Sequence, residues 1–289
     1  MPHNIPVNYH CHSRFDDGHG ELEEYVEAAL QKGLRTLGFA GHAPVPFPCT
    51  WTMAPSLLPE YLDTGRELQN NYRDKLEVLV GLEVDYIPEI ISPTAAQIQA
   101  LDLDFTVGSV HFIGRLAGGE LWTADGPAEE LEQGVQESFD GDIRKAVEEY
   151  YRRLSAMVGS APPDIIGHFD VVKKNNRGDE YFSERSTWYR SAVKQTLDAV
   201  AASPCILEIN TGGIVRGTSG TLYPSEWILA ECLKREIPVM INSDAHRPEQ
   251  LDGYYEEAVL ILREIGFREL TQITREGRRR QVPLQPGPD

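Results

Sequence analysis

The sequence has little cysteine, and its four cysteines lie far apart. They are Cys11, Cys49, Cys205 and Cys232, and no two of them form a Cys-X-X-Cys pair. A small secreted domain held together by disulfides would show a much denser pattern. We therefore expect reduced thiols, and the hydrophobic share of 41% is enough for a substantial core.

Long apolar runs are absent as well. No run approaches the roughly 20 apolar residues that a membrane-spanning helix needs. Residues 1–9 lack a basic segment followed by an apolar stretch of signal-peptide length. We expect a cytoplasmic protein without a membrane partner.

Positive charge is scarce. Lysine and arginine total 27 against 45 aspartates and glutamates, which gives a formal net charge of −18. Non-specific binding to nucleic acid relies on cationic side chains that release counterions from phosphates, so no nucleic-acid partner is expected. The acidity suits solubility, and it is compatible with carboxylates that hold metal cations. A small-molecule substrate fits this balance better.

Common nucleotide-binding and nucleophile motifs are also missing. The sequence has no Gly-rich phosphate loop before Lys-Ser/Thr, no dinucleotide fingerprint and no Gly-X-Ser-X-Gly elbow. Gly212-Gly213 lies at the end of a predicted strand, where it predicts a tight turn rather than a phosphate cradle.

Short apolar runs alternate with helical patterns, as in a parallel sheet with crossover helices. Seven strands are predicted, at Ile5–Tyr9, Thr36–Ala40, Leu76–Leu82, Phe105–Val110, Asp164–Gly167, Cys205–Ile209 and Val239–Asn242. Helices are predicted at Glu21–Leu34, Leu57–Leu68, Ala95–Leu101, Asp142–Met157, Thr187–Ala202, Glu226–Lys234 and Tyr255–Ile265. No run has the pattern of a polar edge strand, which favours a closed α/β barrel over an open sheet.

We interpret residues 1–289 as one barrel domain, because no linker interrupts the alternation. Gly114–Asp140 is rich in Gly and Glu without clear periodicity, and we predict a long loop there, near the mouth of the site. Arg278–Asp289 contains an arginine triplet and three prolines and is predicted to be an irregular tail. The sequence does not indicate an oligomeric state.

Six of the eight histidines stand at or just beyond the carboxyl end of a predicted strand. They are His10, His12, His42, His111, His168 and His246. Glu83 and Asp244 share this placement. Because functional residues converge at these ends in parallel α/β folds, we expect all eight side chains to meet in one small volume. His3 and His19 are expected to be ordinary hydrogen-bonded or solvated side chains.

Imidazole and carboxylate ligands together suit Zn, Mn or Fe. His10 and His12 form a His-X-His pair, and on an extended segment both rings point to the same side. The pair alone is weak evidence. Six imidazoles buried without compensation, however, would destabilise the fold unless a metal or hydrogen bonds satisfied them. The sequence therefore predicts a metal centre.

The order of these motifs resembles that of the polymerase and histidinol phosphatase superfamily. The matching segments are His10-Cys11-His12, Gly38-Phe39-Ala40-Gly41-His42, Gly81-Leu82-Glu83, Gly108-Ser109-Val110-His111, Ile166-Gly167-His168 and Ser243-Asp244-Ala245-His246. The chain is most similar to stand-alone histidinol-phosphate phosphatases, notably in Gly-His-Phe-Asp followed by Lys173-Lys174, in Glu208-Ile209-Asn210-Thr211 with Arg216, and in Arg247-Pro248. The resemblance implies a distorted seven-stranded barrel with three divalent metal ions at the carboxyl ends of its strands.

The resemblance also implies which residues hold each metal. One metal takes His10, His12, Glu83 and Asp244, a second shares Glu83 and adds His111 and His168, and a third takes His42 and His246. The third metal needs one more ligand from the segment after the first motif. We choose Asp17, with Asp16 and His19 as alternatives.

The activity that the resemblance implies is hydrolysis of L-histidinol phosphate to L-histidinol and phosphate, a step of histidine biosynthesis. Adjacent divalent ions lower the pKa of a shared water and neutralise phosphoryl oxygens, so direct in-line attack is expected. Asp244 or a metal-linked histidine such as His246, with Arg247 beside it, is a candidate to protonate the leaving alkoxide.

Basic residues beyond the strand ends are candidates to bind the phosphate. Lys173, Arg216 and Arg247 are predicted to grip its non-bridging oxygens, with ordinary surface salt bridges as the alternative. Glu208 and Asp85 are candidate partners for the amine and imidazole of the substrate.

Other functions share part of this pattern. A related phosphoesterase or nuclease acting on another phosphomonoester or on nucleic-acid phosphodiesters would use the same ligands, but the acidic charge argues against nucleic acid. A metal-dependent hydrolase of carbon–nitrogen bonds is disfavoured by the order of the motifs. A non-catalytic metal-binding protein is disfavoured by the completeness of the ligand set.

Overall fold

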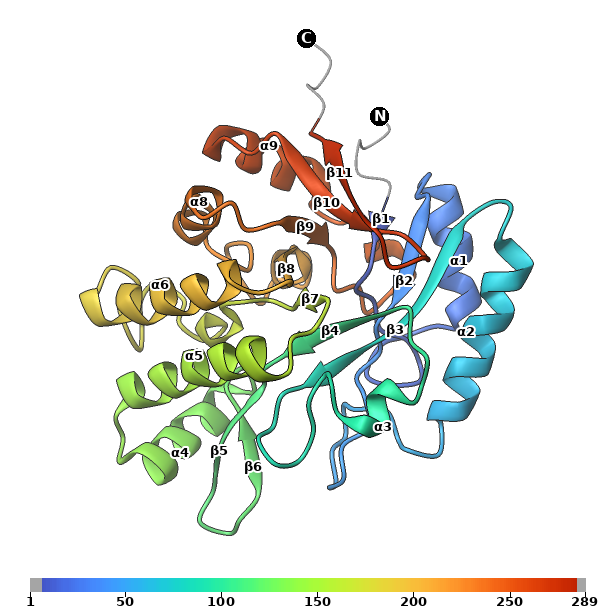
Figure 1. Cartoon of the computed structure of the whole chain (residues 1–289). Coiled ribbons are helices and arrows are strands. Elements are labelled where there is room, and N and C mark those ends of the chain that lie inside the picture. Colours follow the sequence, from blue (N-terminus) through green and yellow to red (C-terminus); the bar gives the residue numbers. More distant parts are fainter. Residues whose placement is uncertain (1–6, 285–289) are drawn as a thin grey trace.

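The computed structural model describes residues 7–284, and seven parallel strands form its centre (Figure 1). The strands lie side by side in chain order: β1 (Val7–Asn8), β2 (Thr36–Phe39), β3 (Glu77–Asp85), β4 (Phe105–Ser109), β7 (Ile165–Ile166), β8 (Ile206–Asn210) and β9 (Val239–Asn242). The seven predicted strands are thus confirmed in position and order, although Ile5 and Pro6 lie outside the described residues.

The two ends of the sheet meet just beyond β1 and β9. His12 N donates to the carbonyl of Ala245 at 2.8 Å, and Ala245 N donates to the carbonyl of His10 at 3.2 Å. These bonds join the first and last strands where the two predicted ligand motifs lie. The distorted seven-stranded barrel predicted from the sequence is confirmed.

Helices surround the barrel (Figure 1). They are α1 (Leu22–Gln31), α2 (Leu58–Tyr72), α3 (Ala96–Gln99), α4 (Ala128–Phe139), α5 (Ile143–Ser160), α6 (Thr187–Ala201), α7 (Gly212–Val215), α8 (Glu226–Lys234) and α9 (Tyr255–Ile265). All seven predicted helices occur within a few residues of their expected bounds. None of the helices in the described part of the chain is long and apolar enough to cross a membrane.

Alternation along β3 explains how one strand serves both the core and the site. Val78, Val80 and Leu82 join the hydrophobic cluster that contains α1 and α2 residues. Side chains of successive residues point to opposite faces of a strand, so Glu83 lies on the inner face of the barrel. Deeper in the barrel, the Phe105 ring fills the space over Gly81, where a Cβ atom would approach the ring to 2.7 Å.

The segment Gly114–Asp140 is structured, so the prediction of a long loop was wrong. It contains most of a hairpin of β5 (Phe112–Arg115) and β6 (Leu121–Thr123), followed by α4. The buried side of α4 is narrow and includes Gly134, which leaves room for the Trp122 ring. The apolar stripe is interrupted by glycine and surrounded by glutamates, so its period was hidden in the sequence.

The predicted irregular tail is also partly wrong. Arg279–Pro283 forms β11, which pairs antiparallel with β10 (Glu269–Ile273). Tyr9 anchors this hairpin to the barrel, because its hydroxyl donates to the carbonyl of Ile273 at 2.8 Å and accepts from Ile273 N at 3.0 Å. Exposed arginines on β11 concealed the strand, since they read as a charged run. Residues 285–289 lie outside the described residues.

Candidate metal centre

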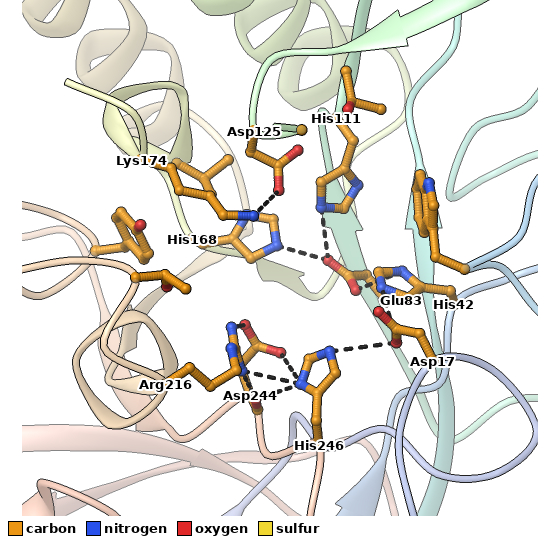
Figure 2. A pocket seen from close by; sticks show the side chains of 16 residues that line it. Asp17, His42, Glu83, His111, Asp125, His168, Lys174, Arg216, Asp244 and His246 are labelled. Atoms are coloured by element: carbon orange, nitrogen blue, oxygen red, sulfur yellow. Dashed lines mark hydrogen bonds and ion pairs between the residues drawn. The ribbon is translucent and has the colours of Figure 1, made fainter. Parts of the chain in front are cut away.

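A cavity of about 360 Å³ opens among the carboxyl ends of the barrel strands (Figure 2). Seven of the nine predicted ligands line it, namely Asp17, His42, Glu83, His111, His168, Asp244 and His246. The other two, His10 and His12, are buried and contact Glu83 and Asp244. The structure therefore brings the whole predicted set together, as parallel strand topology requires.

The four side chains of the first predicted group lie close together. His10 Nε2 lies 3.3 Å from Glu83 Oε2, and His12 Nε2 lies 3.1 Å from Asp244 Oδ1. Across the group, His12 Nε2 is 3.6 Å from Glu83 Oε2 and His10 Nε2 is 3.8 Å from Asp244 Oδ1. Two imidazole nitrogens and two carboxylate oxygens thus face one point between strands β1, β3 and β9.

Three of these atoms have no hydrogen-bond partner within residues 7–284, although they are buried: His10 Nε2, His12 Nε2 and Glu83 Oε2. Unpaired buried polar atoms cost free energy, and a cation at this point would satisfy all of them at once. The mixture of imidazole and carboxylate donors suits Zn, Mn or Fe. The residues present therefore fit a divalent metal ion.

Glu83 also reaches toward the second predicted group. Its Oε1 atom lies 2.9 Å from His168 Nε2 and 3.8 Å from His111 Nε2, and it accepts a hydrogen bond from the Ser109 hydroxyl. Since Oε2 faces His10, the two oxygens of one carboxylate point to different sets of imidazoles. This is the geometry that a bridging ligand needs.

The predicted third group gathers around Asp17. Asp17 Oδ1 lies 3.3 Å from His246 Nε2 and 3.8 Å from His42 Nε2. His42 is shared between groups, because its Nδ1 atom is also 2.9 Å from Glu83 Oε2. Gly18 allows this loop to fold tightly, since a side chain there would collide with the main chain of His12.

The two alternatives to Asp17 have other roles in the structure. Asp16 Oδ2 lies 2.6 Å from His12 Nδ1 and accepts from the main-chain N–H of His42 at 2.8 Å, so it supports the His12 ring and the backbone at His42. His19 is exposed and does not line the cavity. Among the three candidates, Asp17 is the one that lines the cavity, and its role as a ligand stays a prediction.

Carboxylates orient three of the imidazoles from the side away from the centre. His10 Nδ1 contacts Glu208 Oε1 at 2.7 Å, His12 Nδ1 contacts Asp16, and His111 Nδ1 contacts Asp85 Oδ1 at 3.0 Å. Metal-binding histidines commonly have such a partner, which fixes the tautomer and leaves Nε2 for the metal. The arrangement explains why these rings point inward.

Glu208 and Asp85 therefore do not face a substrate, and their suggested contact with its amine and imidazole was wrong. Both carboxylates are buried. Glu208 also accepts from the side chains of Asn210 and Asn242 at 2.9 and 3.0 Å. Sequence reasoning missed their supporting role, because His10 and Glu208 are 198 positions apart and only the barrel brings them together.

Burial and charge act in opposite directions on the histidines. Burial lowers the pKa of His12, but the charge and hydrogen bond of Asp16 outweigh it and raise that pKa to about 10. Burial likewise lowers the pKa of His111, and Asp85 contributes most to raising it to about 10. In the absence of a metal ion, both rings are protonated on both nitrogens, and therefore positively charged, at neutral pH.

The carboxylates show the complementary effect. Burial raises the pKa of Asp244, but the charges of Arg216 and His10 outweigh it and hold that pKa well below its ordinary value. Burial also raises the pKa of Glu83, and the neighbouring imidazoles of His42 and His10 bring it well below the usual range. These carboxylates are ionised at neutral pH and favour a cation between them.

Of the two arginines predicted to bind phosphate, one lines the cavity and the other does not. Arg216 lines the cavity and donates to Asp244 Oδ2 at 2.9 Å, with its Nη1 atom 3.0 Å from His246 Nδ1. Arg247 is exposed and is not among the cavity-lining residues, so its predicted contact with phosphate and leaving group is not supported. Its neighbour His246 turns inward where Arg247 turns outward.

Lys173 is buried and is not among the cavity-lining residues, so its predicted contact with phosphate is not supported. Its Nζ atom lies 2.8 Å from Asp170 Oδ2, donates to the carbonyl of Leu222 at 3.0 Å and contacts the Ser225 hydroxyl. Lys174 lines the cavity instead. The short helix η1 (Val171–Lys173) sends the two consecutive lysines in different directions.

Several cavity-lining residues had no signal in the sequence. Trp51 contacts the rings of His42 and His111, with centroids 4.7 and 5.3 Å away. Asp125 follows β6 and lies 3.5 Å, through its Oδ2 atom, from Lys174 Nζ. Asp125 comes from the segment predicted as a loop near the mouth, so the location was right although the structure of the segment was not.

Comparison with known proteins agrees with this architecture. The PHP domain family matches residues 8–212, and the chain belongs to this family. A protein named "Probable histidinol-phosphatase" from Deinococcus radiodurans is 31% identical, and the alignment covers 87% of this chain and 90% of that protein. "Histidinol-phosphatase" from Bacillus subtilis is 30% identical, with 87% of this chain and 97% of that protein covered.

A solved structure shows the same fold. The histidinol phosphate phosphatase of Lactococcus lactis, complexed with Zn, L-histidinol and phosphate, superposes with a TM-score of 0.69 at 22% sequence identity. The match covers 93% of this chain and 97% of that one. The family and the barrel expected from the sequence are therefore confirmed.

Proposed function

We propose that this protein is a metal-dependent phosphatase that hydrolyses L-histidinol phosphate to L-histidinol and phosphate. The observation that carries the chemistry is the convergence of His10 Nε2, His12 Nε2 and Glu83 Oε2, which are buried and have no hydrogen-bond partner within residues 7–284. The substrate is supported by two relatives of about 30% identity, both named for this activity and aligned over most of their length.

We propose three divalent ions, each Zn, Mn or Fe, held by the nine residues that meet in the cavity. The ligands would be His10, His12, Glu83 and Asp244 for the first, Glu83, His111 and His168 for the second, and Asp17, His42 and His246 for the third. Bound ions would supply Lewis acidity and a water of lowered pKa at the phosphoryl group. Four overlapping clusters of these residues and Asp16 have donor atoms close enough to hold an ion.

His246 is better suited to bind metal than to protonate the leaving group. Its Nδ1 atom lies 3.0 Å from the carbonyl of Asp244. Its Nε2 atom faces Asp17 Oδ1 at 3.3 Å, within the predicted third metal group. Asp244 is equally poorly suited to donate a proton, because its pKa is held well below the ordinary value by Arg216 and His10, against the effect of burial.

Phosphate binding is assigned to Arg216 and Lys174. Both line the cavity, and Arg216 is fixed in direction by its bond to Asp244. A planar guanidinium offers several donors to phosphate oxygens, and the ammonium of Lys174 adds a second positive charge at the cavity wall. These two side chains would orient the phosphate toward the imidazole and carboxylate centre.

Steady-state kinetics on a panel of phosphomonoesters tests the proposal. We expect the highest kcat/KM for L-histidinol phosphate, with loss of activity after chelation and recovery on adding Zn or Mn. The panel should also contain single-stranded DNA as a phosphodiester. Equal or better turnover of the DNA, or full activity of protein without bound metal, would overturn the proposal.

A further inference from the structure

Asp125 is the cavity carboxylate that has no counterpart in the predicted site. It follows β6 and points into the cavity beside His111 and His168, on the side away from Asp17 (Figure 2). Its side chain has a relative solvent exposure of 19%, so it can contact a bound molecule. Asp125 is therefore placed to contact a ligand in the cavity.

The Asp125 carboxylate differs from the other three cavity carboxylates in the partners that it contacts. Asp17, Glu83 and Asp244 each belong to a cluster that could hold a metal ion, and within residues 7–284 Asp125 belongs to none. Its one ion-pair partner in that range is Lys174, at 3.5 Å. Charge-assisted bonds to carboxylates are usually about 2.7–2.9 Å long, so this long contact leaves Asp125 able to accept a closer donor.

The backbone around Asp125 is held firmly by its neighbours. Ala124 N donates to the carbonyl of His111 at 2.8 Å, and Asn175 Nδ2 donates to the carbonyl of Gly126 at 2.9 Å. Thr123 N donates to Glu130 at 2.8 Å. The scaffold thus presents a carboxylate whose one side-chain hydrogen bond within residues 7–284 is the long contact with Lys174, an arrangement that suits a ligand-recognition group.

We propose that Asp125 determines substrate specificity by accepting a hydrogen bond from the ammonium group of the substrate. This inference rests on the proposed function. L-Histidinol phosphate carries its ammonium on the carbon next to the one that bears the phosphate ester. With the phosphate at the imidazole and carboxylate centre, the ammonium lies near the adjoining wall, where Asp125 is the negative group.

The proposed contact between Asp125 and the ammonium group also affects the role of Lys174. An ammonium bound by Asp125 competes with the long Lys174 contact, and Lys174 is then left to the phosphate oxygens. One pair of side chains thus reads both charges of a zwitterionic substrate. With a phosphomonoester that lacks an ammonium group, Asp125 keeps its contact with Lys174, so Lys174 is less available to the phosphate and binding of that substrate is disfavoured.

The test compares Asp125→Asn with wild-type protein on three substrates. These are L-histidinol phosphate, the analogue that lacks only the amine, and p-nitrophenyl phosphate. We expect kcat/KM for L-histidinol phosphate to fall by about 10- to 100-fold, the loss expected for a charge-assisted hydrogen bond. The other two substrates should be hydrolysed as by wild type or faster. Turnover of p-nitrophenyl phosphate also shows that the variant is folded and holds metal.

Glu120→Gln is the matched control. Glu120 is exposed beside β6 in the same hairpin, outside the cavity, so its change removes an equal charge without touching the site. This variant should behave as wild type on all three substrates. A similar loss in both variants would overturn the inference, because it would reflect net charge rather than contact.

Other outcomes are equally decisive. An unchanged preference in Asp125→Asn, or an equal loss on all three substrates, would overturn the specificity role. A loss on both imidazole-containing substrates would assign Asp125 to the imidazole and overturn the ammonium contact. Wild-type protein that hydrolyses p-nitrophenyl phosphate but not L-histidinol phosphate would overturn the proposed function itself, and this inference with it.

Discussion

Glu83 Oε2 lies 3.3 Å from His10 Nε2, and neither atom has a hydrogen-bond partner within the described chain. His10 follows β1 and Glu83 lies in β3, and both side chains are almost fully buried. Such an arrangement is unfavourable unless a cation joins the two atoms. The pair therefore belongs both to the buried interior of the barrel and to the candidate metal centre.

Glu208→Gln tests the support of His10. Glutamine keeps the shape but removes the charge that holds the His10 ring at 2.7 Å. Loss of such a supporting carboxylate should lower metal affinity or activity by about 10- to 100-fold. Metal titration and p-nitrophenyl phosphate kinetics measure the two effects. A defect confined to L-histidinol phosphate would instead show that Glu208 contacts the substrate.

Asp17→Asn and His19→Ala together test the third metal position. Asp17 Oδ1 faces His246 and His42, whereas His19 does not line the cavity. We expect Asp17→Asn to lose one bound metal per chain and most activity, and His19→Ala to lose neither. Elemental analysis of purified protein gives the metal content. Full occupancy in Asp17→Asn with a deficit in His19→Ala would reverse the assignment.

Lys173→Met and Lys174→Met should affect different properties, stability in the first case and substrate binding in the second. Removing Lys173 leaves the buried carboxyl group of Asp170 without its countercharge, which should lower the free energy of unfolding by about 3–5 kcal/mol. Removing the partly exposed Lys174 should leave stability nearly unchanged and raise KM. Urea unfolding and kinetics distinguish the two. A stable Lys173→Met protein with a raised KM would restore Lys173 as a phosphate-binding residue.

Metal binding should release protons. In metal-free protein the pKa values of His12 and His111 are raised to about 10, so both rings are protonated at neutral pH. Metal binds neutral imidazole, so those protons must leave and affinity should rise as the pH increases from about 7 to 9. Calorimetry in buffers of different ionisation enthalpy counts the protons. Affinity that is constant over this range would contradict the prediction.

Local sequence patterns were enough to predict most of the architecture. Apolar periodicity is a property of neighbouring residues, so the seven strands and their helices were visible without a structure. Helix α4 was not, because Gly134 interrupts its apolar stripe to make room for Trp122, a contact that exists only after folding. Strand β11 was missed for a similar reason, since its pairing with β10 defines it.

The sequence by itself determined which residues gather at the barrel mouth, because parallel strands carry the side chains at their carboxyl ends to one edge. Only the tertiary structure decided how each one faces. Lys173, the last residue of η1, is buried, whereas the next residue, Lys174, lines the cavity, and the β5–β6 hairpin brings Asp125 to the cavity wall. The direction of a side chain depends on turn geometry and on partners far away in the chain, and neither is written in the local pattern of residues.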